Sequence, residues 1–125
     1  MINKTMLIID DHKDFRGMLR WFIENRVKDI EIKEAATGEE GVDMAIAEKP
    51  DISLIDIRLP GIDGIETAKQ IKQRVPESQI ITMSMFKQSS VESLIAQQVV
   101  IFLNKETIDS ELIPLLYKLF NENKT

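Results

Sequence analysis

The fold class follows from a stretch in the middle of the chain, Ile52-Ser53-Leu54-Ile55, which ends at Asp56 and leads into the loop Leu59-Pro60-Gly61-Ile62-Asp63-Gly64. A short apolar run bounded by a polar residue and a turn-rich loop predicts a buried strand. The residues from Ile65 onward repeat their apolar positions at helical spacing and stop before Pro76. A strand that ends in a carboxylate and is followed by a helix is one unit of an alternating α/β fold.

The same alternation of strand and helix runs through the whole chain. Only the run 30–35 alternates strictly between apolar and other residues, so it is predicted at an edge, with the other four strands inside the sheet. The predicted strands are Thr5–Ile9, Ile30–Ala35, Ile52–Ile55, Gln79–Met83 and Val99–Leu103. The predicted helices carry the apolar sets Phe15, Met18, Leu19 and Phe22; Val42, Ala45 and Ile46; Ile65, Ala68 and Ile71; Val91, Leu94 and Ile95; and Leu112, Leu115, Leu116 and Leu119. This order predicts a parallel sheet with helices on both faces.

The same pattern predicts where the helices begin and end. Thr37 is expected to be the N-cap of the second helix, and Pro114 is expected early in the last one. Residues 121–125 are polar and are expected to form a frayed tail. We therefore expect one domain over residues 1–125.

Composition excludes several classes of protein. The chain has 125 residues, with 16 Lys and Arg against 21 Asp and Glu, so its net charge is −5. This balance argues against nucleic-acid binding by the domain itself, because phosphate binding relies on clustered cations. The absence of cysteine excludes disulfides, thiolate metal sites and a thiol nucleophile. No apolar run approaches the ~20 residues of a membrane span, so we expect no membrane association and a cytoplasmic location.

Charged and hydroxyl residues follow four of the predicted strands. Asp10 and Asp11 follow the first, Asp56 the third, Ser84 the fourth and Lys105 the fifth. Ligands bind open α/β sheets at the carboxyl ends of the strands. If the first and third strands are neighbours, three carboxylates meet and need a cation, and carboxylate oxygens without His or Cys suit Mg²⁺ or Mn²⁺. Carboxylates, divalent ion, lysine and hydroxyl together make a phosphoryl site with a carboxylate nucleophile.

Each of these residues also has a simpler interpretation. Asp10 and Asp11 alone are explained equally well as a cap of the first helix. Lys105, taken alone, is explained as a solvated surface side chain. His12, the one histidine of the chain, is expected to be an exposed residue of the first turn rather than a catalyst. The prediction therefore rests on the conjunction of the four strand ends.

Four stretches together carry a resemblance to a known family. They are Ile8-Ile9-Asp10-Asp11, the segment 54–64, Thr82-Met83-Ser84 and Phe102-Leu103-Asn104-Lys105. The chain resembles the receiver domain of two-component response regulators over essentially its whole length, with hints of the class joined to LuxR/NarL-type output domains. The resemblance implies a flavodoxin-like, three-layer α/β/α fold with a five-stranded parallel sheet of order 2-1-3-4-5.

The resemblance also implies roles for the acidic residues. Asp56 would be the phosphoacceptor. Asp10, Asp11 and Asp56 would hold Mg²⁺, or Mn²⁺, together with the backbone carbonyl of Arg58. The protein would catalyse its own aspartyl phosphorylation and dephosphorylation without being a turnover enzyme.

Three further residues would read out the phosphoryl group. Lys105 would pair with the phosphoryl oxygens, Ser84 would hydrogen-bond them, and Phe102 would be the aromatic that turns inward. The face formed by the fourth helix, fifth strand and fifth helix would then change. A sensor histidine kinase would donate the phosphoryl group, and an output domain, a partner protein or a second copy of the chain in a homodimer would respond.

The chain departs from the family pattern around the expected acceptor. Met85 stands where a small residue is usual and would narrow access to Asp56, while Arg58 and Phe86 flank the site and would tune it. Gln98-Val99 replaces a common Gly-Ala pair, and Glu106 replaces a common proline.

Alternative functions differ in class. A receiver-like interaction module that is never phosphorylated keeps the fold, and Met85 is its main support. An aspartyl-type phosphatase needs Asp-x-Asp after the first strand, whereas this chain has adjacent Asp10 and Asp11. A flavin protein lacks its phosphate loop, and a nucleotide kinase lacks G-x-x-x-x-G-K-[ST].

Overall fold

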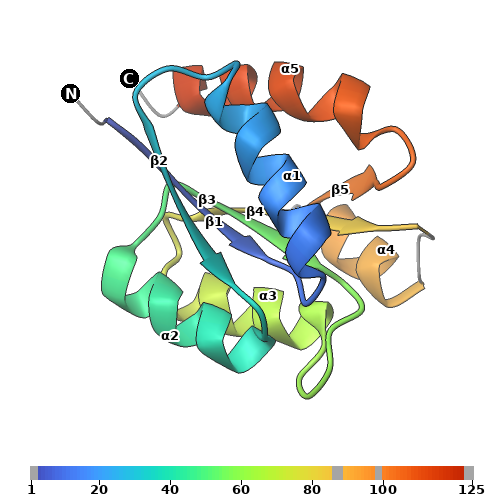
Figure 1. The fold of residues 1–125 in the computed structure, drawn as a ribbon. Coiled ribbons are helices and arrows are strands. Elements are labelled where there is room, and N and C mark those ends of the chain that lie inside the picture. The colour runs from blue at the N-terminus through green and yellow to red at the C-terminus, as the bar shows by residue number, and fades with distance from the viewer. Residues whose placement is uncertain (1–2, 86–88, 98–99, 123–125) are drawn as a thin grey trace.

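The computed structural model describes residues 3–85, 89–97 and 100–122, and these form one parallel five-stranded sheet between two layers of helices (Figure 1). The strand order is β2-β1-β3-β4-β5, as the resemblance implied. The strands are β1 Lys4–Ile9, β2 Ile30–Ala35, β3 Ile52–Asp56, β4 Gln79–Ser84 and β5 Val100–Asn104. The helices are α1 Lys13–Glu24, α2 Gly38–Glu48, α3 Gly64–Arg74, α4 Ser89–Ala96 and α5 Ile108–Glu122.

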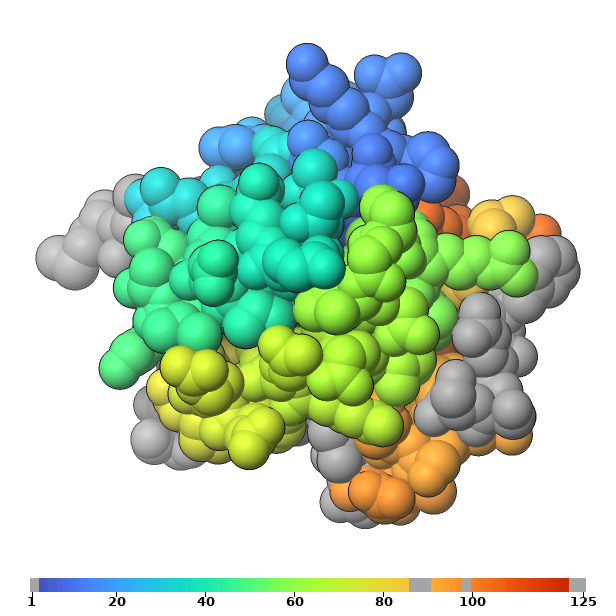
Figure 2. All heavy atoms as spheres, turned by 90° about the horizontal axis from the view of Figure 1, so that it is seen from below, coloured from blue at the N-terminus to red at the C-terminus, as the bar shows by residue number. Residues whose placement is uncertain are grey.

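Helices α1 and α5 cover one face of the sheet, and α2, α3 and α4 cover the other (Figure 1). Figure 2 looks onto the second face, where α3 lies between α2 and α4. Each face has its own apolar core, because neighbouring residues of a buried strand point to opposite sides. Ile8 and Leu54 belong to the core under α1 and α5, whereas Ile9 and Ile55 belong to the core on the other face.

Four strands extend one residue beyond their predicted runs, β1 at its start and β3, β4 and β5 at their ends, and the extensions of β3 and β4 concern the site. β3 includes Asp56, which pairs with Met83, and β4 includes Ser84, which pairs with Asn104. Asp56 and Ser84 are almost completely buried. The hydrogen-bonded ladder therefore fixes their backbone positions.

The prediction that the fifth strand lies inside the sheet is wrong. β2 is an edge as expected, but β5 is the opposite edge. A run of apolar residues does not exclude an edge position when helices cover both faces, as α4 and α5 do here. Val99, the predicted first residue of this strand, lies outside the described residues.

The predicted limits of the last helix are also corrected. α5 begins at Ile108, before the first leucine used to predict it, so Pro114 lies inside the helix rather than early in it. Asn121 and Glu122 are helical, so the prediction of a frayed tail from residue 121 onward is wrong for these two residues. Burial of Leu112, Leu116 and Leu119 against the sheet holds this helix in place despite the missing proline N–H. Among the described residues, no helix is long and apolar enough to cross a bilayer.

Gly64 fixes the loop that follows Asp56. Its N–H donates to the Ile57 carbonyl at 2.8 Å. A Cβ atom at position 64 would lie 2.1 Å from the Asp56 carbonyl oxygen and 2.5 Å from the Ile57 Cα. Both neighbours are backbone atoms of the strand end, so neither can move without displacing the site.

We predict that Gly64→Ala lowers the free energy of unfolding by about 1–3 kcal/mol, because the added methyl group overpacks against backbone. The matched control is Gly17→Ala in α1, where a Cβ meets nothing within 4 Å. That change should raise stability by about 1 kcal/mol, since alanine favours a helix over glycine. Urea denaturation of both variants measures the two effects, and equal stability of the variants would contradict the account.

Candidate functional site

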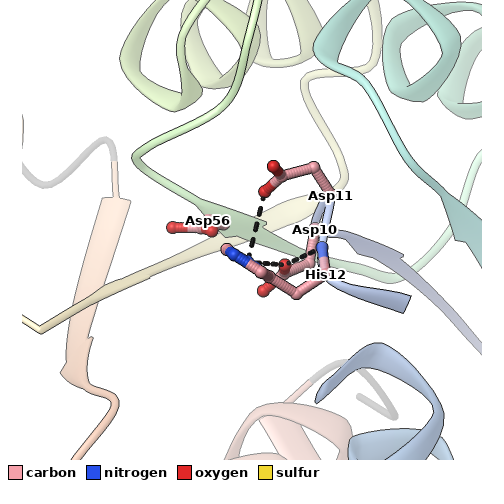
Figure 3. Close-up of side chains that lie close together, drawn as sticks. All are labelled: Asp10, Asp11, His12 and Asp56. Atoms are coloured by element: carbon pink, nitrogen blue, oxygen red, sulfur yellow. Dashed lines mark hydrogen bonds and ion pairs between the residues drawn. The ribbon is translucent and has the colours of Figure 1, made fainter. Parts of the chain in front are cut away.

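Three carboxylates meet at the carboxyl end of the sheet, because β1 and β3 are neighbours. Asp10 and Asp11 follow β1 directly, and Asp56 ends β3. Together with His12 they offer four ligand atoms that all lie within 4.8 Å of one another (Figure 3). The Asp10 and Asp56 side chains are buried, whereas Asp11 is one-third exposed.

Lys105 brings a cation to this cluster from the far edge of the sheet. Its Nζ donates to Asp10 Oδ2 at 3.0 Å and to Asp56 Oδ2 at 3.2 Å. The ring of Phe15 lies 4.4 Å from the same Nζ, which adds a cation–π contact. The backbone N–H of Lys105 donates to the Ser84 carbonyl at 2.9 Å, so the start of its loop is tied to the end of β4.

The surroundings of Asp56 disfavour the ionised form of its carboxyl group. Burial raises the pKa of the Asp56 carboxyl, and the neighbouring charge of Asp10 raises it further. Lys105 and the Arg58 N–H, which donates to Asp56 Oδ1 at 3.1 Å, lower this pKa but do not cancel the rise. The folded protein therefore opposes the negative charge that Asp56 needs as a nucleophile.

An arginine of α1 anchors the end of β1. Arg16 Nη1 donates to the Asp10 carbonyl at 2.6 Å, and its Nε pairs with Glu34 at 2.7 Å. Arg20 pairs with the second oxygen of Glu34 at 2.9 Å. This network joins β1, α1 and β2 behind the carboxylates. No sequence pattern predicts this network, because Arg16 donates to a backbone carbonyl, whose position depends on the fold.

The cap interpretation of the Asp-Asp pair does not describe the structure. The N-cap of α1 is His12, and its side chain makes no capping hydrogen bond. Asp10 Oδ1 accepts the N–H of His12 itself at 2.8 Å, which orders the turn between β1 and α1. His12 is exposed, as expected. Its ring nevertheless lies within the cluster, whereas the sequence predicted a site made of carboxylates without histidine.

A hollow of about 150 Å³ opens beside the cluster. Met85 lies at its edge with 44% of its surface exposed, and the Asn104 amide donates to its carbonyl at 3.3 Å. The lining residues are His12, Asp56, Arg58, Ser84, Met85 and Lys105. The hollow thus gives solvent a route to a carboxylate that is itself buried.

Phe102 and Met83 belong to the two apolar cores of the sheet. Phe102 is partly buried on β5 and packs against the core on the α2, α3 and α4 face. Met83, which pairs with Asp56 between β3 and β4, is fully buried in the opposite core and so packs against it. Phe86 lies outside the described residues.

The residues present fit a divalent cation. Three carboxylates supply the hard oxygen ligands that Mg²⁺ and Mn²⁺ prefer. The single ammonium group does not balance the two buried charges, as the raised pKa of Asp56 indicates. Asp10, Asp11 and Asp56 are the residues that would hold the ion.

Comparison with known proteins agrees with this geometry. The family model of the response regulator receiver domain matches residues 6–117. The chain belongs to this family. The resemblance predicted from the sequence is therefore confirmed, and the family comprises signalling domains rather than metabolic enzymes.

Named relatives include regulators from several bacteria. The chain is 43% identical over 82 residues to the transcriptional regulatory protein LiaR of Bacillus subtilis, a match that covers 65% of this chain and 38% of that one. It is 31% identical over 81 residues to the nitrate/nitrite response regulator NarL of Escherichia coli, covering 65% and 38%. The chain thus spans less than two-fifths of the length of these relatives.

Two further matches cover most of both chains. Sporulation initiation phosphotransferase F of Bacillus subtilis is 31% identical over 86 residues, covering 69% of this chain and 68% of that one. The receiver domain of AraT, a response regulator from Geobacillus stearothermophilus, has a TM-score of 0.85 at 25% identity and covers 99% and 97% of the two chains.

We predict that Asp56→Asn stabilises the protein at pH 7 in the presence of EDTA, by roughly 1–2 kcal/mol, because it removes a buried charge that the fold opposes. Since the folded-state pKa is raised, the wild type loses stability as the pH rises through that pKa, and the advantage of the variant shrinks as the pH falls.

Urea denaturation at several pH values measures this effect. Asp63→Asn is the matched control, because Asp63 caps α3 by accepting the Glu66 N–H and asparagine caps equally well. If Asp56→Asn were less stable than the wild type at pH 7, the ionised Asp56 carboxylate would be stabilising the folded protein, contrary to this prediction.

Proposed function

We propose that this domain is a phosphorylation switch in which Asp56 accepts a phosphoryl group from a histidine of a sensor kinase. The observation that carries the proposal is the position of Lys105 Nζ, within hydrogen-bond distance of Asp10 and Asp56. A carboxylate nucleophile, a fixed cation and a solvent-open hollow in one place are what phosphoryl transfer to a side chain requires.

Asp56 is the proposed nucleophile. One of its carboxylate oxygens attacks phosphorus, the bond from phosphorus to the donor nitrogen breaks, and the electron pair of that bond remains on the donor imidazole. The Arg58 N–H holds Oδ1, so the carboxylate is oriented before the donor arrives. Hydrolysis of the product by water would restore Asp56, so the domain would catalyse its own dephosphorylation.

Lys105 stabilises the charge that the phosphoryl oxygens carry. Its ammonium group already lies beside the nucleophile, so little reorganisation is needed during the reaction. A divalent ion held by Asp10, Asp11, Asp56 and the Arg58 carbonyl would supply Lewis-acid stabilisation of the same oxygens.

Ser84 and Phe102 are the proposed readout of the phosphoryl group. Phosphorylation adds about −1.5 to −2 charges and three acceptor oxygens beside Asp56. Ser84 lies at the same hollow, and a hydrogen bond from its hydroxyl would draw in the end of β4. Phe102 on the neighbouring strand β5 would then repack, and the α4-β5-α5 face would change.

The partners follow from the relatives and the length of the match. Because the chain spans less than two-fifths of LiaR and NarL, we propose that the switch controls an output domain of the transcription-regulating kind named for those relatives. A homodimer formed through the changed face is the proposed form of the signal. A cytoplasmic location fits a kinase donor, and the net charge of −5 fits a domain that leaves DNA contact to its output partner.

We predict that acetyl phosphate with Mg²⁺ adds one phosphoryl group to the wild type and none to Asp56→Asn, as read by intact mass. Asp63→Asn carries the same substitution at the base of the same loop and should be modified like the wild type. Full incorporation into Asp56→Asn would place the acceptor elsewhere. A wild type that takes up neither phosphoryl group nor beryllofluoride would favour the interaction module.

We predict that Met85→Ala speeds modification by acetyl phosphate several-fold, because the thioether narrows the hollow in front of Asp56. Met18→Ala is the matched control, since Met18 is equally exposed, at 47% against 44%, but lies on α1 outside the residues lining the hollow. The rate of mass gain measures both. An unchanged or slower rate in Met85→Ala would show that Met85 does not limit access to Asp56.

A further inference from the structure

The imidazole of His12 lies among the carboxylates of the proposed ion site. Its Nδ1 is 3.3 Å from Asp10 Oδ1 and 3.4 Å from Asp11 Oδ1 (Figure 3). A ligand atom of Asp56 lies within 4.8 Å of each of these groups. The cluster therefore offers one nitrogen ligand in addition to its oxygens.

The spacing of these atoms matches ligands that share one ion. Metal–nitrogen and metal–oxygen bonds of about 2.0–2.2 Å place neighbouring ligands roughly 3.0–3.5 Å apart. The two distances from Nδ1 fall within this range. Nδ1 therefore lies at a ligand–ligand distance from an oxygen of each of the two carboxylates.

Neither packing nor capping explains where this ring lies. The side chain of His12 is 68% exposed, so the core does not hold it. The side chain makes no capping hydrogen bond to α1. Asp10 Oδ1 already accepts one hydrogen bond, from the backbone N–H of His12. The ring contacts the two carboxylates, Asp10 through a hydrogen bond or ion pair and Asp11 through an ion pair, and a shared ion would hold it in the same position.

The two oxygens of Asp10 face different partners. Oδ2 accepts from Lys105, and Oδ1 faces His12. The cluster thus has a lysine side, where the phosphoryl group is proposed to bind, and an imidazole side, bounded by Asp11 and His12. An ion on the imidazole side leaves Lys105 free to keep its contact with Asp56.

We propose that His12 Nδ1 is a ligand of the divalent ion and that it makes this site favour first-row transition ions over Mg²⁺. Imidazole nitrogen suits cobalt, nickel and zinc, whereas Mg²⁺ prefers oxygen and keeps its waters. Nδ1 binds an ion only through its lone pair, so the ring proton lies on Nε2 in the ion-bound form. The inference rests on the proposed function, because it concerns the same ion site.

The test compares Mg²⁺ and Co²⁺ binding by calorimetry to the untagged wild type, His12→Ala and Lys13→Ala. Lys13 is the exposed next residue, so its variant changes local charge without removing a ligand. We expect His12→Ala to weaken Co²⁺ binding about 10-fold or more and Mg²⁺ binding less than about two-fold. Lys13→Ala should leave the ratio of the two affinities unchanged.

A spectroscopic readout distinguishes ligation from an indirect effect. His12 is the only histidine in the chain, so paramagnetically shifted imidazole signals with Co²⁺ can come from no other residue. We expect such signals in the wild type and their loss in His12→Ala. Their absence from the Co²⁺-bound wild type, or equal weakening of both ions in His12→Ala, would overturn the inference and leave the phosphorylation switch intact. A wild type that binds neither ion would instead contradict the ion-dependent switch itself.

Discussion

The ammonium group of Lys105 lies between two buried carboxylates, Asp10 and Asp56, and the whole carboxyl end of the sheet is organised around this contact. It joins β1 and β3 to the loop after β5, three segments far apart in the sequence. Without a cation there, two negative charges would remain in a low-dielectric site at a cost of several kcal/mol. The ring of Phe15 and the carbonyl of Ser84 hold Lys105 from two further elements.

The single positive charge of Lys105 does not neutralise the negative charges of the carboxylates, and this excess of negative charge links stability to function. The pKa of Asp56 remains raised by burial and by Asp10 despite the ammonium group. The fold therefore maintains an unfavourable carboxylate at the place where a bound cation would offset the negative charge. Carboxyl groups with a pKa perturbed by burial and by a neighbouring charge cluster at functional sites, so the raised pKa marks Asp56 as a candidate functional group.

Local patterns in the sequence predicted the alternating α/β fold and the residues at the strand ends, whereas the strand order that puts β1 beside β3 was implied only by the family resemblance. Apolar runs and helical spacing locate β1 to β4, and the residues that end them meet because parallel strands end at one edge. The edge position of β5 and the continuation of α5 through Pro114 depend on which helices cover which strands, which no local pattern encodes. The ring of His12 and the bond from Arg16 to a backbone carbonyl were missed for the same reason: they arise from the turn that the folded strand and helix impose.

The most direct test of the account is an amide NMR titration of the wild type, first with Mg²⁺ and then with beryllofluoride, a mimic of the phosphoryl group. We expect Mg²⁺ to shift the signals of residues 10–12 and 56–58, and beryllofluoride to add shifts at Ser84, Lys105 and Phe102. Signals that do not move at millimolar Mg²⁺, or that move on β2 and α2 instead, would contradict a cation-dependent acceptor at Asp56.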